Sequence, residues 1–328
     1  MRLRRLLLIL FTVFLVAGYF SIAYAANIYI VNHSANNVLV LDEKDNSIVA
    51  IIDVGKEPVG IAINPETKMA YVANKGDNTV SVIDVVNNNV VATVKVGVTP
   101  WYAAVDSTAN KIYVNSSGDN LISVIDGGSN TVVAQMQTTV TGKGAVKGAF
   151  NIAVNPSANR AYLINCLATT MLVIDTAENK VIGTVGTGRD PLGIAVNTAE
   201  NRAYIANNAD NTVTVIDTAN NTVAATVKVG SGPWSVAVDP DIKKVYVTNR
   251  YDSTVSVIDT VNNKVIATLR VGKEPLTAAF VGDRVYVTNC IDNTITVINT
   301  ANDTVSSTVM LPGVKWTGLC PWGIAVFR

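Results

Sequence analysis

The chain has 328 residues, of which 49% are hydrophobic and 15% charged, and its 25 basic and 25 acidic residues cancel to a formal net charge of zero. That hydrophobic content over about 300 residues is ample for a buried core. The charge balance excludes a strongly basic chain, so we expect no nucleic acid partner, because a polyphosphate backbone is bound through an excess of Lys and Arg.

The first 25 residues predict a Sec-type signal peptide. Residues 1–5 carry three positive charges, residues 6–22 form an apolar run, and Ala23-Tyr24-Ala25 matches the small-x-small pattern of a cleavage site. The alternative is an uncleaved membrane anchor, since the apolar run is close to the length that a bilayer requires. Cleavage leaves residues 26–328, which carry no second apolar span.

Cleavage also changes the charge and the expected location of the chain. Loss of Arg2, Arg4 and Arg5 leaves 22 basic residues against 25 acidic ones, a net charge of −3. We expect the mature chain outside the cytoplasm, where it is periplasmic, secreted or held at the cell surface.

Residues 26–328 consist of seven copies of one unit. Each copy carries a tyrosine at the start of a motif such as YIVN, YVAN or YVTN, and these tyrosines are Tyr29, Tyr71, Tyr113, Tyr162, Tyr204, Tyr246 and Tyr286. They are 42, 42, 49, 42, 42 and 40 residues apart. The third and fourth copies are separated by a seven-residue insertion. A constant period of this length is typical of a repeat architecture.

Each copy contains four short, alternating, β-branched runs bounded by Asn, Asp, Gly and Pro, with no helical period. In the second copy these runs, which we name strands a to d, cover residues 58–63 (PVGIAI), 70–74 (AYVAN), 79–84 (TVSVID) and 90–97 (VVATVKVG). Four strands in about 42 residues are typical of one β-propeller blade. The sequence therefore predicts an all-β, seven-bladed β-propeller with four antiparallel strands per blade, strand a innermost and strand d outermost.

The two ends of the chain are expected to share one blade. The first copy begins on strand b at Tyr29 and has no strand a, whereas residues 321–328 (PWGIAVFR) repeat the beginning of a unit and nothing more. We predict that this C-terminal strand joins the N-terminal blade and closes the ring, which leaves no unpaired inner edge.

The repeat resembles the YVTN-repeat β-propeller family. Residues 246–249 and 286–289 both read YVTN, and the resemblance covers essentially all of residues 26–328. Proteins of this kind include archaeal surface-layer proteins and bacterial periplasmic proteins. The resemblance implies a seven-bladed propeller that works outside the cytoplasm, and it implies no particular activity, because propellers host both binding and catalysis.

Polar residues that recur from copy to copy are interpreted as structural. Asp residues recur in the b–c turns (Asp77, Asp119, Asp210, Asp252 and Asp292) and at the ends of strand c (Asp42, Asp84, Asp126, Asp175, Asp217 and Asp259). Asp bonds its own backbone in turns, and a residue needed for folding recurs once per blade whereas a catalytic residue does not. The repeated tyrosine is likewise expected to pack between blades.

A candidate site is expected where the copies differ. The residue after the proline position of strand a, which is Ala149 in the fourth copy, is Val59, Trp101, Phe150, Leu192, Trp234, Leu276 or Trp322. The fourth tryptophan, Trp316, lies in an enlarged loop before Trp322. We predict that Trp101, Phe150, Trp234, Trp316 and Trp322 line a ligand site at one mouth of the central channel, since ligand sites are concave and aromatic-lined. The alternative is that these rings only fill space between inner strands.

The three cysteines and the single histidine occupy related positions. Cys166, Cys290 and His33 each follow the Asn of a strand b, and Cys320 precedes the closing strand. We predict a Cys290–Cys320 disulfide, because export permits oxidation and both residues belong to one face of neighbouring blades, and we expect Cys166 to be free. A His/Cys/Cys metal site is disfavoured, because no C-x-x-C-like pair of ligands occurs.

Two functions remain open at this stage. The favoured one is a non-enzymatic binding or cell-surface interaction scaffold, without cofactor or metal, whose partner is an unidentified protein, glycan or small molecule. The alternative is an exported propeller enzyme, such as a lyase or lactone hydrolase, with its site in the same mouth. Such enzymes gather several His, Glu or Asp residues around the channel, whereas the inner strands here are mostly Gly, Ala, Ile and Val.

Overall fold

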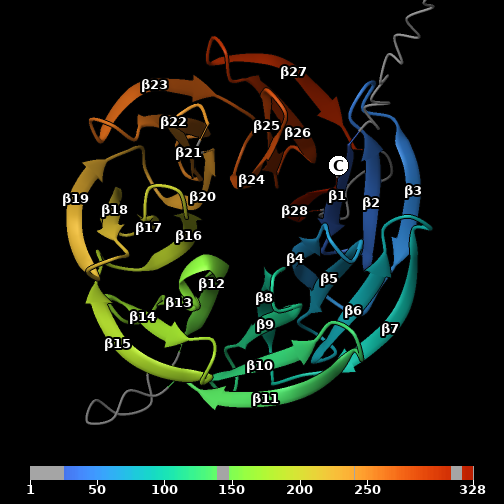
Figure 1. The fold of residues 1–328 in the computed structure, drawn as a ribbon. Helices are drawn as coiled ribbons and strands as arrows, with labels where there is room; N and C mark the ends of the chain where they lie inside the picture. The colour runs from blue at the N-terminus through green and yellow to red at the C-terminus, as the bar shows by residue number, and fades with distance from the viewer. Residues whose placement is uncertain (1–25, 139–147, 240, 312–319, 328) are drawn as a thin grey trace, which may run out of the picture.

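The computed structural model describes residues 26–138, 148–239, 241–311 and 320–327. Within these ranges the strands form seven four-stranded antiparallel sheets around a common axis (Figure 1), which confirms the predicted seven-bladed propeller. Apart from strands, the described residues form one short 3-10 helix, Pro156–Ala158. The predicted signal peptide and Trp316 lie outside the described residues.

Seven strands surround the axis and seven more pair with them. The inner strands are β4 (Pro58–Asn64), β8 (Pro100–Asp106), β12 (Ala149–Asn155), β16 (Pro191–Asn197), β20 (Pro233–Asp239), β24 (Pro275–Val281) and β28 (Pro321–Phe327). The b strands are β5 (Met69–Asn74), β9 (Lys111–Ser116), β13 (Arg160–Asn165), β17 (Arg202–Asn207), β21 (Lys244–Asn249), β25 (Arg284–Asn289) and β1 (Asn27–Asn32).

The two outer strands of each blade follow in chain order. The c strands are β6 (Thr79–Asp84), β10 (Leu121–Asp126), β14 (Thr170–Asp175), β18 (Thr212–Asp217), β22 (Thr254–Asp259), β26 (Thr294–Asn299) and β2 (Asn37–Asp42). The d strands are β7 (Asn89–Lys95), β11 (Thr131–Gln137), β15 (Lys180–Gly186), β19 (Thr222–Lys228), β23 (Lys264–Arg270), β27 (Thr304–Met310) and β3 (Ile48–Asp53). We number the blades 1 to 7 from the blade that contains β1.

Blade 1 takes its strands from both ends of the chain, as predicted. Its strand order is β28-β1-β2-β3, and β28 pairs antiparallel with β1, with Ile30 opposite Ile324 and Ile28 opposite Val326. The ring is therefore closed by backbone hydrogen bonds between residues almost 300 positions apart. The prediction that the two ends of the chain share one blade is confirmed.

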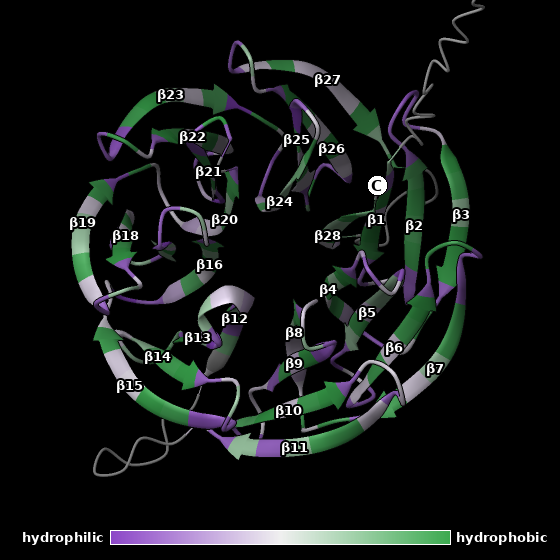
Figure 2. Cartoon of the chain, in the orientation of Figure 1, coloured by the Kyte–Doolittle hydropathy of each residue, from purple (hydrophilic) through white to green (hydrophobic). Residues whose placement is uncertain are grey.

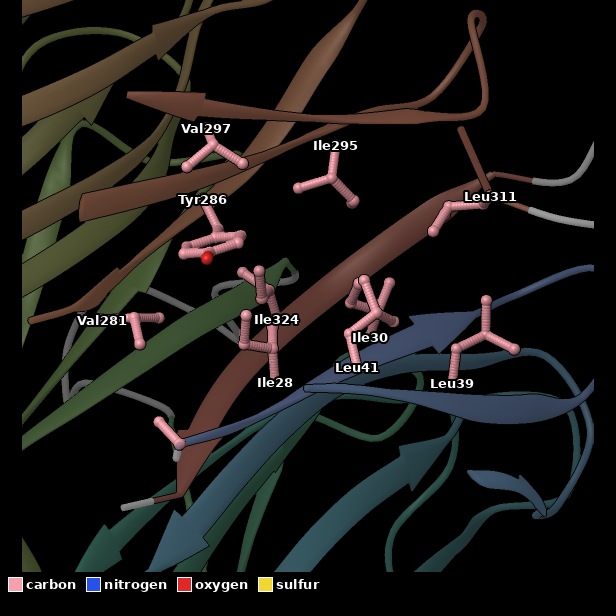
Figure 3. Packing of buried hydrophobic residues seen from close by; sticks show 11 residues of the cluster. Ile28, Ile30, Leu39, Leu41, Val281, Tyr286, Ile295, Val297, Leu311 and Ile324 are labelled. Atoms are coloured by element: carbon pink, nitrogen blue, oxygen red, sulfur yellow. The ribbon is translucent and has the colours of Figure 1, made fainter. Parts of the chain in front are cut away.

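The hydrophobic core lies between neighbouring blades. Strands are mostly hydrophobic and turns hydrophilic (Figure 2), and each buried cluster joins the facing sides of two blades. Figure 3 shows the interface of blades 7 and 1, where Tyr286 packs near Val281, Ile28 and Ile324. All seven repeated tyrosines are fully buried at equivalent interfaces: Tyr29, Tyr71, Tyr113, Tyr162, Tyr204, Tyr246 and Tyr286. Their predicted role as packing residues between blades is confirmed.

The asparagine of the YVTN-like motif binds the neighbouring strand c. In blade 2 the Asn74 side-chain amide donates to the hydroxyls of Thr79 (3.0 Å) and Ser81 (2.9 Å). Blades 5, 6 and 7 repeat both bonds through Asn207, Asn249 and Asn289. A Cβ atom on Gly55 would lie 2.6 Å from Asn74, so the Asn side chain requires the glycine that follows strand d.

The repeated aspartates are structural, but the two sets act differently. Asp84, at the end of strand c, accepts from the N–H groups of Val86 and Asn87 in its own turn, as expected. Asp77, in the b–c turn, instead accepts from the N–H of Lys56 in the preceding d–a loop. Its equivalents Asp119, Asp210, Asp252 and Asp292 do the same. The b–c carboxylates thus hold the loop that leads into each inner strand.

Every inner strand carries an irregularity just after its first residue. The register between strands a and b shifts in all seven blades, for example between Pro58 and Ile61 and between Pro233 and Val236. A β-bulge of this kind re-aims the side chain at that point. The affected position is the one at which the sequence predicts the candidate site.

Candidate functional site

Four of the five predicted aromatic residues meet at the axis. Ring centroids lie 5.0 Å apart for Trp101–Phe150, 5.8 Å for Phe150–Trp234, 6.0 Å for Trp234–Trp322 and 5.8 Å for Trp322–Trp101. The four residues, which we call the mouth cluster, therefore form a closed cycle of ring contacts. Trp316, the fifth predicted residue, lies outside the described residues.

The mouth cluster joins blades that are not neighbours. Trp322 belongs to blade 1, Trp101 to blade 3, Phe150 to blade 4 and Trp234 to blade 6. Of the four contacts only Trp101–Phe150 links adjacent blades, so the rings lie across the end of the axis. The edge-on and tilted angles, from 41° to 88°, are those that aromatic pairs prefer.

The remaining three positions of this register carry aliphatic residues. Val59, Leu192 and Leu276 belong to blades 2, 5 and 7, and their side chains are buried. Trp101, Trp234 and Trp322 are only partly buried. Large and small residues therefore share the seven positions, and the three indoles retain some accessible surface. Their strands begin at the face formed by the d–a loops and b–c turns. We call this face the mouth face.

Two cations lie over rings of the mouth cluster. The Lys75 Nζ atom is 4.9 Å from the Trp101 ring centroid, and the Arg250 guanidinium carbon is 5.0 Å from that of Trp234. Such cation–π contacts are attractive because the ring face is electronegative. Neither residue is among those predicted from the sequence for the site.

Tyr102 also belongs to the site and was not predicted. Its ring centroid lies 5.7 Å from that of Phe150. Burial raises the pKa of the Tyr102 phenol to about 12. The phenol therefore stays protonated at neutral pH, where it can donate a hydrogen bond but is a poor general base.

His33 connects the closing strand to blade 2. Its backbone N–H donates to the Cys320 carbonyl, its ring lies 5.4 Å from the Trp322 ring, and its Nδ1 is 3.0 Å from the Pro58 carbonyl oxygen. Because a carbonyl only accepts, Nδ1 carries the hydrogen of this bond. The histidine thus has a positioning role next to the mouth cluster.

The cysteines lie on the same face. Cys290 and Cys320 form a disulfide with their Cα atoms 4.4 Å apart, and it ties the start of β28 to the end of β25. Cys166 is a free thiol whose pKa is raised by burial and by the nearby Asp190 carboxylate. A thiol held in its protonated form is a weak nucleophile.

Neither a metal centre nor a membrane span is found in the described part of the chain. Within those residues, no group of three or more His, Cys, Asp or Glu side chains converges so as to hold a metal ion. The same ranges contain no helix with the length and apolar character needed to cross a bilayer.

Lys75 and Arg250 occupy the same repeat position, the residue that follows strand b, and variation at this position could have identified them from the sequence. This position reads His33, Lys75, Ser117, Cys166, Asn208, Arg250 and Cys290, where Ser117 follows Ser116 because the Asn of the third copy is shifted to Asn115. Like the position at the start of strand a, it varies between copies. Four members of this set contact the indoles. Lys75 and Ser117 contact Trp101, Arg250 contacts Trp234, and His33 contacts Trp322.

Comparison with known proteins supports the fold. No protein-family model matches the chain, and no curated protein sequence matches it. Among solved structures, hydrazine synthase from Kuenenia stuttgartiensis is 22% identical with a TM-score of 0.76, covering 84% of this chain and 93% of the other. A functionally unknown protein from Desulfotomaculum acetoxidans DSM 771 is 17% identical with a TM-score of 0.78, covering 92% and 99%.

A third similar structure is the dihydro-heme d1 dehydrogenase NirN in complex with DHE. It is 12% identical with a TM-score of 0.66, and the match covers 91% of this chain and 74% of NirN. At these identities the likeness shows the propeller fold and nothing about activity.

Proposed function

We propose that this chain is an exported propeller that binds a ligand at the mouth cluster and acts as a non-enzymatic binding or cell-surface scaffold. The apolar segment and cleavage pattern of residues 1–25 support export, as does the resemblance to YVTN-repeat propellers. The observation that carries the binding proposal is the closed cycle of rings of Trp101, Phe150, Trp234 and Trp322, three of them partly accessible.

Aromatic rings gathered at one end of a propeller axis suit a ligand with a flat apolar face. Stacking on exposed indoles gains contact area at little cost in side-chain entropy, because the rings already hold one another in place. The seven blades form a rigid frame around them. The scaffold therefore presents a preorganised aromatic surface, and the mixed residues around it supply polar contacts.

An enzyme with its site in the same mouth is the second candidate. Two similar structures, hydrazine synthase and dihydro-heme d1 dehydrogenase, bear the names of enzymes, but a shared fold alone does not extend an activity to this chain. The titratable groups next to the mouth cluster favour binding instead. Tyr102 has a pKa of about 12, and the Cys166 thiol has a raised pKa. Both groups therefore stay protonated at neutral pH, where they are poor general bases.

A neutral environment-sensitive dye tests the binding proposal. Titration of residues 26–328 with N-phenyl-1-naphthylamine, followed by fluorescence, should show saturable binding near one site per chain. Trp101→Ala should weaken this binding by about tenfold, because the mouth cluster loses one of its four rings. Val133→Ala, on the outer strand β11 and 56% exposed, is the matched control and should leave it unchanged. Unaltered binding by Trp101→Ala, with circular dichroism like that of the wild type, would refute the proposal.

A further inference from the structure

The two cations of the mouth face stand on nearly opposite sides of the mouth cluster. Lys75 follows β5 of blade 2 and Arg250 follows β21 of blade 6. Three blades separate them in one direction around the ring and two in the other. Each lies over a different indole, Lys75 over Trp101 and Arg250 over Trp234. A flat molecule on the aromatic surface would therefore have a cation near either end.

Arg250 is held in a fixed orientation by Glu274, and its Nη1 group remains available as a hydrogen-bond donor. Its Nε and Nη2 donate to Glu274 Oε2 at 3.1 and 2.7 Å, while its guanidinium also lies 5.8 Å from the Tyr251 ring centroid. Among the described residues Nη1 makes no hydrogen bond. A guanidinium positioned by one carboxylate and two rings loses little entropy when Nη1 donates to an incoming oxygen.

Lys75 is held more loosely. Its Nζ lies 3.7 Å from Glu57 Oε2, beyond ordinary hydrogen-bond distance, and the side chains are 30% and 55% exposed. An exposed pair of this kind contributes little, so an anionic ligand can take the place of Glu57. The neighbouring Asp77 and Asp252 compete less with a ligand for these two cations, because each carboxylate already accepts a hydrogen bond from a backbone N–H of a d–a loop.

We propose that the ligand of the mouth cluster is a small aromatic anion: a flat apolar ring system that carries a carboxylate or sulfonate group. This inference rests on the proposed function and narrows it. The ring system stacks on the indoles, and the anionic group is bound by Arg250 Nη1 or Lys75 Nζ at the edge of the cluster. A cationic ligand would meet two positive charges at the same edges, and a neutral one would leave both donors unused.

Two dyes that differ only in charge test this inference. The anionic dye 8-anilinonaphthalene-1-sulfonate has the ring system of N-phenyl-1-naphthylamine plus one sulfonate. For residues 26–328 at low salt, we expect the anionic dye to bind about tenfold more tightly than the neutral one. The advantage should shrink in 0.5 M NaCl, because partly exposed charges are screened by salt.

Single substitutions assign the effect to the two cations. Arg250→Gln and Lys75→Gln should each weaken binding of the anionic dye severalfold and change binding of the neutral dye by a clearly smaller factor, because only the anionic dye loses a charge interaction. Lys95→Gln, on the outer strand β7, is the matched control for loss of one positive charge and should change neither. Glu57→Gln and Glu274→Gln should strengthen binding of the anionic dye, since each removes a competing carboxylate while keeping an acceptor oxygen.

The outcomes separate this inference from the proposed function. Equal affinity for both dyes, with no response to Arg250→Gln or Lys75→Gln, would overturn the anionic ligand and leave the mouth cluster as a site for neutral molecules. Binding of either dye that persists in Trp101→Ala would place the dye elsewhere and overturn both proposals. Failure of both dyes to bind would also overturn both proposals.

Discussion

Two positions recur once in every blade and behave in opposite ways. The tyrosine of strand b is present in all seven copies and is fully buried each time. The residue after the first position of strand a is aromatic in four blades and aliphatic in three. The tyrosine packs between its own blade and the next one, so its apolar surroundings are similar in each copy and the same residue fits all seven. The strand a position faces an axis that all blades share, and seven large rings cannot occupy one space.

The difference shows where the repeat can acquire a function. A position between blades is constrained by packing, and any change there costs stability. At the axis, the space available limits the combined size of all seven side chains and not the size of each one. Trp101 and Trp322 can therefore be large because Val59 and Leu276 are smaller and buried. The cations Lys75 and Arg250 come from a second position of the same kind.

Removal of residues 321–328 should have the largest effect, because it removes the strand that closes the ring and one member of the mouth cluster. Blade 1 loses β28 and exposes the inner edge of β1, while the mouth cluster loses Trp322. We expect loss of cooperative thermal unfolding and aggregation through the unpaired edge. Deletion of residue 328 alone is the control, since β28 ends at Phe327. A soluble truncated chain with an unchanged melting transition would contradict ring closure by this strand.

A matched pair of substitutions should sharpen the comparison itself. Tyr204→Ala removes a fully buried ring between blades 5 and 6 and should lower the free energy of unfolding by about 3–5 kcal/mol. Trp101→Ala removes a larger but partly exposed ring at the axis and should cost only about 1–2 kcal/mol. Denaturant unfolding measures both values. A greater loss for Trp101→Ala than for Tyr204→Ala would mean that the mouth cluster chiefly stabilises the fold.

Loss of the disulfide should have a smaller effect, confined to ring closure. The bond encloses a loop of 30 residues, so the double substitution Cys290→Ser and Cys320→Ser should lower the free energy of unfolding by about 3 kcal/mol. Cys166→Ser should have almost no effect, because Cys166 is the free thiol. Alkylation followed by intact-mass measurement provides the direct check. Three reactive thiols in the native, unreduced protein would contradict the bond.

Much of the architecture could be predicted from the sequence because it is local and repeated. Alternating β-branched runs, the period of about 42 residues and the half-unit at residues 321–328 were sufficient for the strands, the seven blades and their closure. The turn role of Asp84 was predicted correctly, since an Asx turn involves only adjacent residues. The role of Asp77 was predicted less well, because its partner Lys56 lies 21 residues earlier in another loop.

The sequence by itself determined which positions vary, and it placed Trp101, Phe150, Trp234 and Trp322 in one register. Only the tertiary structure decided that Phe150 contacts Trp234 two blades away, that Lys75 and Arg250 lie over indoles, and that the Tyr102 ring contacts Phe150. The physical reason is that such contacts depend on the curvature of the whole ring. A repeat records the neighbours that every blade shares, whereas the axis joins side chains from distant copies.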